Sequence, residues 1–300
     1  MNALVYRGLL LFFKNKQAVI GSFIGALIMI ILYVFLLGDS LVNSLSVLSH
    51  PKLVVDTWML AGVIGISSAS STLGSVSLMI RDKERSVYTD FMISPISKSK
   101  IMLGYFFSTF LISLLVTSVV IIVAEIYIVT LSKGTLLSLP QFGLLFLVSL
   151  LTVFCSSAFM FFIASFFRRI DTFSTMTSII GPLIGFLTGC YVPIGSLPET
   201  AQTVVQYFPL TSGVVLIRRI LTENVFTAAD KPAMDTIKEE LGIVMNGQND
   251  VLLPIAILIL SSFLFLALAL WNVKRVEVKR YFFNAKKTLE VALKSFASLD

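Results

Sequence analysis

The sequence predicts an all-α integral membrane protein with six membrane-spanning helices. Apolar residues make up 56% of the 300 residues and charged residues only 13%, which leaves more apolar surface than a soluble domain could bury. The apolar residues are gathered in contiguous runs, close to the roughly 20 residues that a helix needs to cross the hydrocarbon core. They do not follow the ten-residue alternation of a membrane β-barrel, so the spans are expected to be helical.

The predicted spans cover most of the chain. They are residues 17–37, 57–80, 101–131, 140–167, 172–191 and 251–273. The third and fourth spans are longer than the hydrocarbon core requires, so we expect them to tilt or to extend into water. An outer loop, residues 192–250, separates the last two spans and contains a possible helix at 232–241.

The two ends of the chain are predicted to lie at the membrane surface. Within residues 1–16, Leu and Phe side chains supply apolar surface, while Arg7 and Lys14 can reach lipid headgroups. This pattern is typical of a helix that lies in the interface. Residues 274–300 form a basic tail after the last span.

The basic residues predict the orientation. Of the 23 Lys and Arg residues, 17 lie before span one, between spans two and three, between spans four and five, or after span six. Because basic loops remain in the cytoplasm, we expect both termini there, in a multi-pass protein of a bacterial plasma membrane. The net charge of +6 fits this bias and the anionic lipid headgroups, and no patch indicates nucleic-acid binding.

The chain lacks the sequence features of an enzyme. It has no G-x-x-x-x-G-K-[ST] phosphate loop, and its sole histidine, His50, is not part of a metal-ligand cluster. We therefore expect no catalytic residue, metal site or cofactor in this chain. Glu125 is the one acidic residue inside a predicted span. Such a carboxylate is a functional candidate, although its place near the outer end favours a solvated or snorkelling side chain.

A charged island, residues 81–95, separates the second and third spans. Residues 84–93 can form about three helical turns, with Val87 and Phe91 on one face and Tyr88 and Met92 beside them. Pro95 ends the helix, and the serine at position 97 can cap the next one. Nothing within the island itself can bury the apolar face, so the pattern suggests docking onto another protein.

The island also resembles a known family pattern. Residues 84–97, E-R-S-V-Y-T-D-F-M-I-S-P-I-S, resemble the E-R-G-T-x-E-x-L-x-x-T-P-[IV]-S pattern of type 2 ATP-binding-cassette (ABC-2) exporter permeases. Ser86, Thr89 and Ser94 depart from that pattern. In the family this segment is the coupling helix, which sits in a cleft of the ATPase subunit. The resemblance therefore implies ATPase-coupling roles for Glu84, Arg85, Val87, Tyr88, Phe91, Met92 and Pro95. Charge alone would favour a solvated loop.

A second resemblance follows the fifth span. Residues 189–199, G-C-Y-V-P-I-G-S-L-P-E, precede a Tyr-Phe-Pro-Leu-Thr run and the pair Arg218-Arg219, as in the outer half-helices of the same family, which dip back towards the membrane. Pro198 can begin a helix and Pro209 can end it. A second short helix is then expected at 211–221. Such backbone is tolerated where protein buries it or where it lines a wet cavity. The implied outer gate comprises Pro193, Leu197, Pro198 and Pro209. A plain extracellular loop is the alternative.

Small residues recur at helix-packing spacing in two spans. In the second span, Ala61, Gly65 and Ala69 favour packing within the bundle. The fifth span carries the four-residue series Thr177, Gly181, Gly185 and Gly189. There the resemblance implies an interface between two permease halves, near the transport path. The hydroxyls of this span can either line the path or bond their own backbone.

The resemblance covers residues 1–273 and implies the membrane subunit of an ATP-driven exporter. Its partners would be ABC ATPase subunits, which bind ATP and Mg²⁺, a second permease copy or a paralogue, and membrane lipids. The few charged residues along the spans favour an amphipathic or hydrophobic cargo, such as a drug, a peptide antibiotic or a lipid-linked molecule. An ATPase-independent channel or secondary carrier, and a membrane enzyme or scaffold, are the alternatives.

Overall fold

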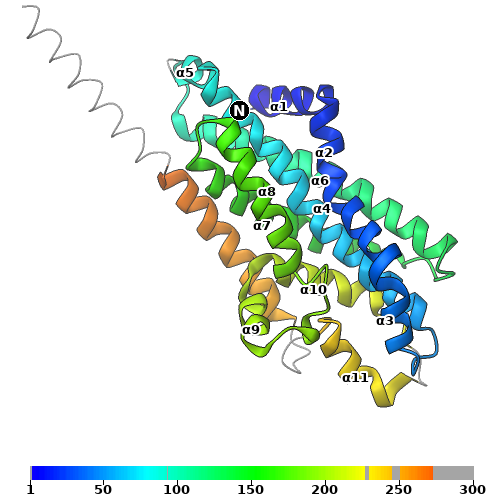
Figure 1. The fold of residues 1–300 in the computed structure, drawn as a ribbon. Helices are drawn as coiled ribbons and strands as arrows, with labels where there is room; N and C mark the ends of the chain where they lie inside the picture. The colour runs from blue at the N-terminus through cyan, green and yellow to red at the C-terminus, as the bar shows by residue number, and fades with distance from the viewer. Residues whose placement is uncertain (1, 93, 227–229, 245–250, 273–300) are drawn as a thin grey trace, which may run out of the picture.

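A computed structural model describes residues 2–92, 94–226, 230–244 and 251–272, which form helices and connections without a strand among them (Figure 1). Five helices are long and apolar enough to cross a membrane. They are α4 (Pro51–Glu84), α6 (Lys98–Thr130), α7 (Leu139–Ser165), α8 (Ile170–Leu187) and the helix Leu252–Asn272. The predicted all-α membrane fold is therefore confirmed. The predicted basic tail 274–300, residue 273 of the last predicted span and loop residues 227–229 and 245–250 lie outside the described residues.

The N-terminal helices form a bent pair. Helix α1 (Asn2–Lys14) meets α2 (Lys16–Leu32) at 79°. Asn15 lies at the corner, and its side-chain oxygen accepts a hydrogen bond from the Ala18 backbone nitrogen at 3.3 Å, which caps α2. A π-helical turn, Tyr33–Leu37, continues α2 and leads into α3 (Gly38–Ser44). Helix α1 thus crosses one end of the bundle while α2 runs along it (Figure 1).

Helix α4 is the central element of the bundle. It packs against α2, α6, α7, α8 and α10, and most of its residues between Val54 and Ile80 are buried. Its 34 residues extend beyond the predicted span 57–80 at both ends. The extension brings three acidic residues into the helix, Asp56, Asp82 and Glu84. Asp56 and Asp82 are buried.

The buried acids at the α3 end each have a polar partner. Asp56 accepts hydrogen bonds from the hydroxyl of Tyr33 and, at 2.7 Å, from that of Ser132. Glu125 is only 9% exposed, and its carboxylate accepts from the Leu137 backbone nitrogen at 2.7 Å. The expectation of a solvated Glu125 is therefore wrong. Its carboxylate instead holds the connection that leads into α7, which satisfies a buried charge through a backbone donor.

At the end away from α1, two helices meet in a sharp bend. Helix α9 (Glu199–Tyr207) and α10 (Pro209–Thr222) meet at 89°. Helix α10 lies buried against α4 and α7. A Cβ at Gly65 would overlap Val214 of α10, so small residues permit this close approach. The predicted packing of span two within the bundle is confirmed, as are the predicted helices near 211–221 and 232–241, the latter being α11 (Lys231–Glu240).

Candidate functional site

The charged island lies at the same end of the bundle as α1 (Figure 1). Helix α4 ends at Glu84, and a short helix, α5 (Val87–Met92), follows after one turn of chain. Ser86 has φ +64°, which takes the chain out of the right-handed helical path, so α5 is shorter than the predicted helix 84–93. Ser94 closes α5, since its backbone nitrogen and its hydroxyl both donate to the Phe91 carbonyl, at 3.3 and 2.7 Å.

The apolar face of α5 packs on its own chain. The Tyr88 hydroxyl donates to the sulfur of Met102 on α6 at 3.3 Å, and the Arg7 guanidinium of α1 lies 5.6 Å from the ring centroid of Phe91. Val87 is likewise half-buried. Helices α1 and α6 therefore cover part of this face, and its docking onto another protein stays a prediction. The side chain of Met92 lies outside the described part of the chain.

The exposed side of the island is polar. Glu84, Arg85, Thr89, Asp90 and Pro95 are exposed. The Ser97 backbone carbonyl accepts the first bonds of α6, but its side chain makes no capping bond, contrary to prediction. We call the exposed residues Arg85, Thr89, Asp90 and Pro95 the α5 outer surface.

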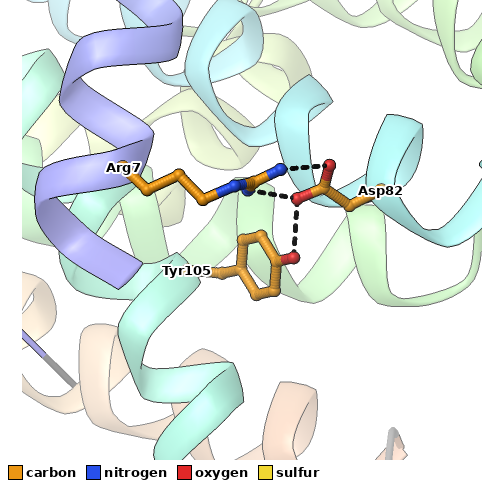
Figure 2. Close-up of polar contacts among 3 residues, drawn as sticks. All are labelled: Arg7, Asp82 and Tyr105. Carbon is orange, nitrogen blue, oxygen red and sulfur yellow. Dashed lines mark hydrogen bonds and ion pairs between the residues drawn. The ribbon is translucent and has the colours of Figure 1, made fainter. Parts of the chain in front are cut away.

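A buried ion pair ties α1 to the island (Figure 2). The two terminal nitrogens of Arg7 donate to the two carboxylate oxygens of Asp82, at 2.6 and 3.0 Å, and the Tyr105 hydroxyl donates to Asp82 at 2.7 Å. Asp82 is 4% exposed. The hydrogen bond to Asp82 raises the pKa of the Arg7 guanidinium, so Arg7 is charged at every physiological pH. The sequence suggested that Arg7 reaches a lipid headgroup, but in the structure it binds Asp82 of α4.

A second contact joins the island to α8. The Glu84 carboxylate accepts from the Ile170 backbone nitrogen at 3.4 Å, in the first turn of α8. An anionic group is stabilised at a helix N-terminus by the unpaired backbone donors and the helix dipole. The contact is exposed and contributes little energy, but it joins the end of α4 to the start of α8.

A groove of about 450 Å³ lies between α2, α4 and α8. Small and hydroxyl-bearing residues form much of its lining: Gly21, Gly25, Ser70, Gly74, Ser77, Ser174, Thr177, Ser178 and Gly181. Thr177 and Ser178 also donate to the Ser174 carbonyl, at 2.9 and 3.0 Å. The bonds of these hydroxyls to their own backbone are therefore observed, and their lining of a transport path stays a prediction.

The small-residue series of the fifth span divides into two parts. Thr177 and Gly181 line the groove, whereas a Cβ at Gly185 would overlap the ring of Tyr191. Gly189 lies beyond the end of α8 at φ +63°, where it closes the helix. Its backbone nitrogen donates to the Phe186 carbonyl at 3.0 Å, and the backbone nitrogen of residue 190 donates to the Gly185 carbonyl at 3.0 Å. Two members thus face the groove, and two shape the turn that follows α8.

The turn after α8 is held by a buried arginine. Arg218 of α10 is fully buried and donates to the carbonyls of Gly189 at 2.6 Å and Gly242 at 3.5 Å. Its guanidinium lies 5.0 Å from the ring centroid of Trp58, whose indole nitrogen donates to the Leu241 carbonyl at 2.7 Å. The contacts of Arg218 therefore join α4, the turn after α8, α10 and the end of α11.

The prolines between α8 and α10 mark helix boundaries. Pro193 precedes a 3₁₀ turn, Ile194–Ser196, and Pro198 is the N-cap of α9 rather than its first residue. Pro209 is the first residue of α10, where its missing N–H costs no helical bond. Leu197 is half-buried. The predicted break between two half-helices is thus confirmed in geometry.

Comparison with known families identifies the chain. Residues 49–271 match the ABC-2 family transporter protein, which is 223 of the 300 residues. The chain belongs to the ABC-2 transporter family. No curated protein matches it significantly. The matched region runs from the start of α4 into the last span, and helices α1 to α3 precede it. The chain is accordingly a permease, the membrane component of an ABC transporter.

The structure adds two groups to the predicted site of the permease. Sequence reasoning missed Asp82 as the centre of the α1–α4–α6 contact, although the helical period from Ser75 through Met79 to Asp82 places it on the buried face of α4. It also treated Arg218 only as a basic residue in the family pattern. No local signal identified that role, because the carbonyls that Arg218 binds are 29 and 24 residues away.

Replacing Ser86 by Gly is expected to stabilise the permease. Ser86 adopts φ +64° at the position where the family pattern has glycine, and a left-handed conformation costs a non-glycine residue about 1 kcal/mol. The thermal melting temperature of the purified S86G protein should therefore rise by a few degrees. The control T89G places glycine inside α5 and should lower it. A lower melting temperature for S86G than for the original protein would contradict the strain argument.

Proposed function

We propose that this permease is the membrane subunit of an ATP-driven exporter, with ATP and Mg²⁺ bound by separate ATPase subunits rather than by this chain. The placement of α5 supports the proposal. Its inner face is fixed to α1 and α6, the preceding helix end is fixed to α1 through Asp82, and its outer surface is exposed. A force applied to the α5 outer surface would therefore be passed to α1, α4, α6 and α8 as a unit.

The proposed membrane arrangement has six spans. Helix α2 with its π-helical turn forms the first, the five long helices form the others, and α1 lies in the interface at the end that carries α5. Basic residues gather at that end, among them Lys14, Arg81, Arg85, Lys100 and Arg168, so we place it in the cytoplasm. Helices α9 and α10 then form an outer re-entrant pair, with Pro193, Leu197, Pro198 and Pro209 at the exit.

A second permease copy, or a paralogue, would complete the path. Helix α8 is covered by its own chain over only a small part of its surface: Ile179, Leu183 and Phe186 are at least half exposed. Beside them lies the groove with its small and hydroxyl residues, which permits close approach of another helix. Arg81 is the one charged residue of the groove lining, which supports an amphipathic or hydrophobic cargo, such as a drug, a peptide antibiotic or a lipid-linked molecule.

The test of this function is recovery of the ATPase. The tagged permease, purified from its native cell, should carry a partner that hydrolyses ATP, in a complex whose mass corresponds to two permeases and two ATPases. Reversing a charge on the α5 outer surface, Asp90→Arg, should reduce ATPase recovery and cargo export at least about tenfold, because Asp90 is exposed and makes no contribution to the bundle core.

The matched control is Asp235→Arg, a charge reversal at an exposed position of α11 at the other end of the molecule. It should leave ATPase recovery unchanged. Transport by the purified permease in vesicles without any ATPase, together with full activity of the D90R variant, would instead favour the alternative of a channel or secondary carrier.

A further inference from the structure

A basic cavity lies where the α1–α2 bend meets the end of α4. Its volume is about 360 Å³. We call it the basic cavity, because four of the five charged residues that line it are basic: Arg7, Lys14, Arg81 and Arg85, with Asp82 as the fifth. These residues come from two separate stretches of the sequence, so the cavity exists only in the folded chain.

The charge of the basic cavity is unbalanced. Both carboxylate oxygens of Asp82 are bound by Arg7, and one also by Tyr105. Lys14, Arg81 and Arg85 remain, and none of the three forms an ion pair within the described part of the chain. Asn15, the N-cap of α2, also lines the cavity, so the positive end of that helix adds to the field. The cavity therefore favours a ligand with at least one negative charge.

The rest of the cavity is apolar. Leu11, Phe12, Ala18 and Leu78 contribute to its lining, and α1 exposes Leu10 and Phe13 beside them. The basic cavity also shares Ala18, Gly74, Ser77 and Arg81 with the groove between α2, α4 and α8. Cations beside an apolar lining fit an amphiphile, with its charged headgroup in the cavity and its chain along α1 or in the groove.

We propose that the basic cavity binds the phosphate headgroup of an anionic phospholipid from the cytoplasmic leaflet. The proposal rests on the membrane orientation given under the proposed function. Helix α1 crosses the end of the bundle at 79° to α2, which places the cavity at headgroup depth. A phosphate bridging Lys14 and Arg85 would link α1 to the first turn of the island, beside the Arg7–Asp82 pair. The bound lipid would thereby stiffen the connection between α5 and the spans.

The test measures lipid retained by the purified permease alone. The protein is placed in phosphatidylcholine nanodiscs with and without phosphatidylglycerol, and the lipids that survive extraction are counted by native mass spectrometry. The triple variant Lys14→Gln, Arg81→Gln, Arg85→Gln should retain phosphatidylglycerol at least about tenfold less well than the original protein, because each basic residue near the surface adds to the attraction. Retention of phosphatidylcholine should not change.

A matched triple variant controls for total charge. Lys100→Gln, Arg168→Gln, Arg169→Gln removes three exposed cations from the same end of the bundle, none of which lines the cavity, and it should retain phosphatidylglycerol normally. Equal loss in both triple variants, or no loss in the first, would overturn the proposal.

Two further outcomes separate other ligands. Glycerol 3-phosphate or inorganic phosphate that raises the melting temperature as much as phosphatidylglycerol would show a soluble phosphate site, and the lipid assignment would be overturned. A cavity variant that retains the lipid but loses the ATPase during purification would show that these cations dock a protein, with the same consequence. The measurement needs neither ATPase nor transport, so its failure is distinguishable from failure of the proposed function.

Discussion

Replacing Arg7 by Met is expected to lower the free energy of unfolding of the permease by about 3 kcal/mol. The change leaves the Asp82 carboxylate, which is 4% exposed, with Tyr105 as its remaining partner. Breaking a buried pair by removing one member costs about 3–5 kcal/mol, and the partial exposure of Arg7, 32% at the side chain, places the loss near the lower limit. Equilibrium unfolding of the purified protein in mixed micelles measures this loss of free energy.

The two members of this pair should differ in their effects. Asp82→Asn is expected to cost only about 1 kcal/mol, because the amide can still accept from Tyr105 and Arg7 can turn towards water or headgroups. The double variant R7M/D82N should therefore be more stable than R7M alone. Arg169→Met is the control, since its ion pair with Asp171 is 3.9 Å long and exposed, and it should change stability little. A smaller loss for R7M than for D82N would show that the carboxylate is not the desolvated member.

The sequence predicted the spans better than their ends. The apolar runs located all five long helices, because a helix that crosses lipid must satisfy its backbone internally and cover it with apolar side chains. It placed the ends of α4 too far inward, since Asp56 and Asp82 interrupt the apolar run. Both acids are accommodated by partners from other helices, Tyr33 and Ser132 for the first and Arg7 and Tyr105 for the second. No local pattern contains those partners.

The sequence predicted where the helices of the charged island and of the segment after α8 break, but not which of their faces are covered. Proline and serine signals located the break after the island and the break between α9 and α10, because these residues act on the backbone beside them. Which face of α5 is covered depends on α1, about 80 residues earlier in the sequence. The same limit explains the division of the fifth-span series. Spacing identified Gly185 and Gly189, but the side chains of Tyr191 and Ile194 occupy the space that a Cβ at each would need.

Arg218→Ala is expected to destabilise the segment from the turn after α8 to the end of α11 by about 3 kcal/mol or more. The change removes hydrogen bonds to the carbonyls of Gly189 and Gly242, ends the contact with the ring of Trp58 and leaves a cavity in a fully buried site. Arg218→Lys should recover only part of this loss, because a compact ammonium group cannot reach both carbonyls as the guanidinium fork does.

The location of the lost protection distinguishes a local connection made by Arg218 from a general contribution to core packing. If Arg218 joins the turn after α8 to the end of α11, amide hydrogen exchange in R218A should accelerate at residues 189–197 and 240–244, while α6 stays protected. Trp58→Phe is the matched variant: it keeps a ring beneath Arg218 but loses the bond to the Leu241 carbonyl, so it should cost about 1 kcal/mol. Uniform acceleration of amide hydrogen exchange across all helices in R218A would contradict a local connection, because a connection confined to these four elements must fail at them first.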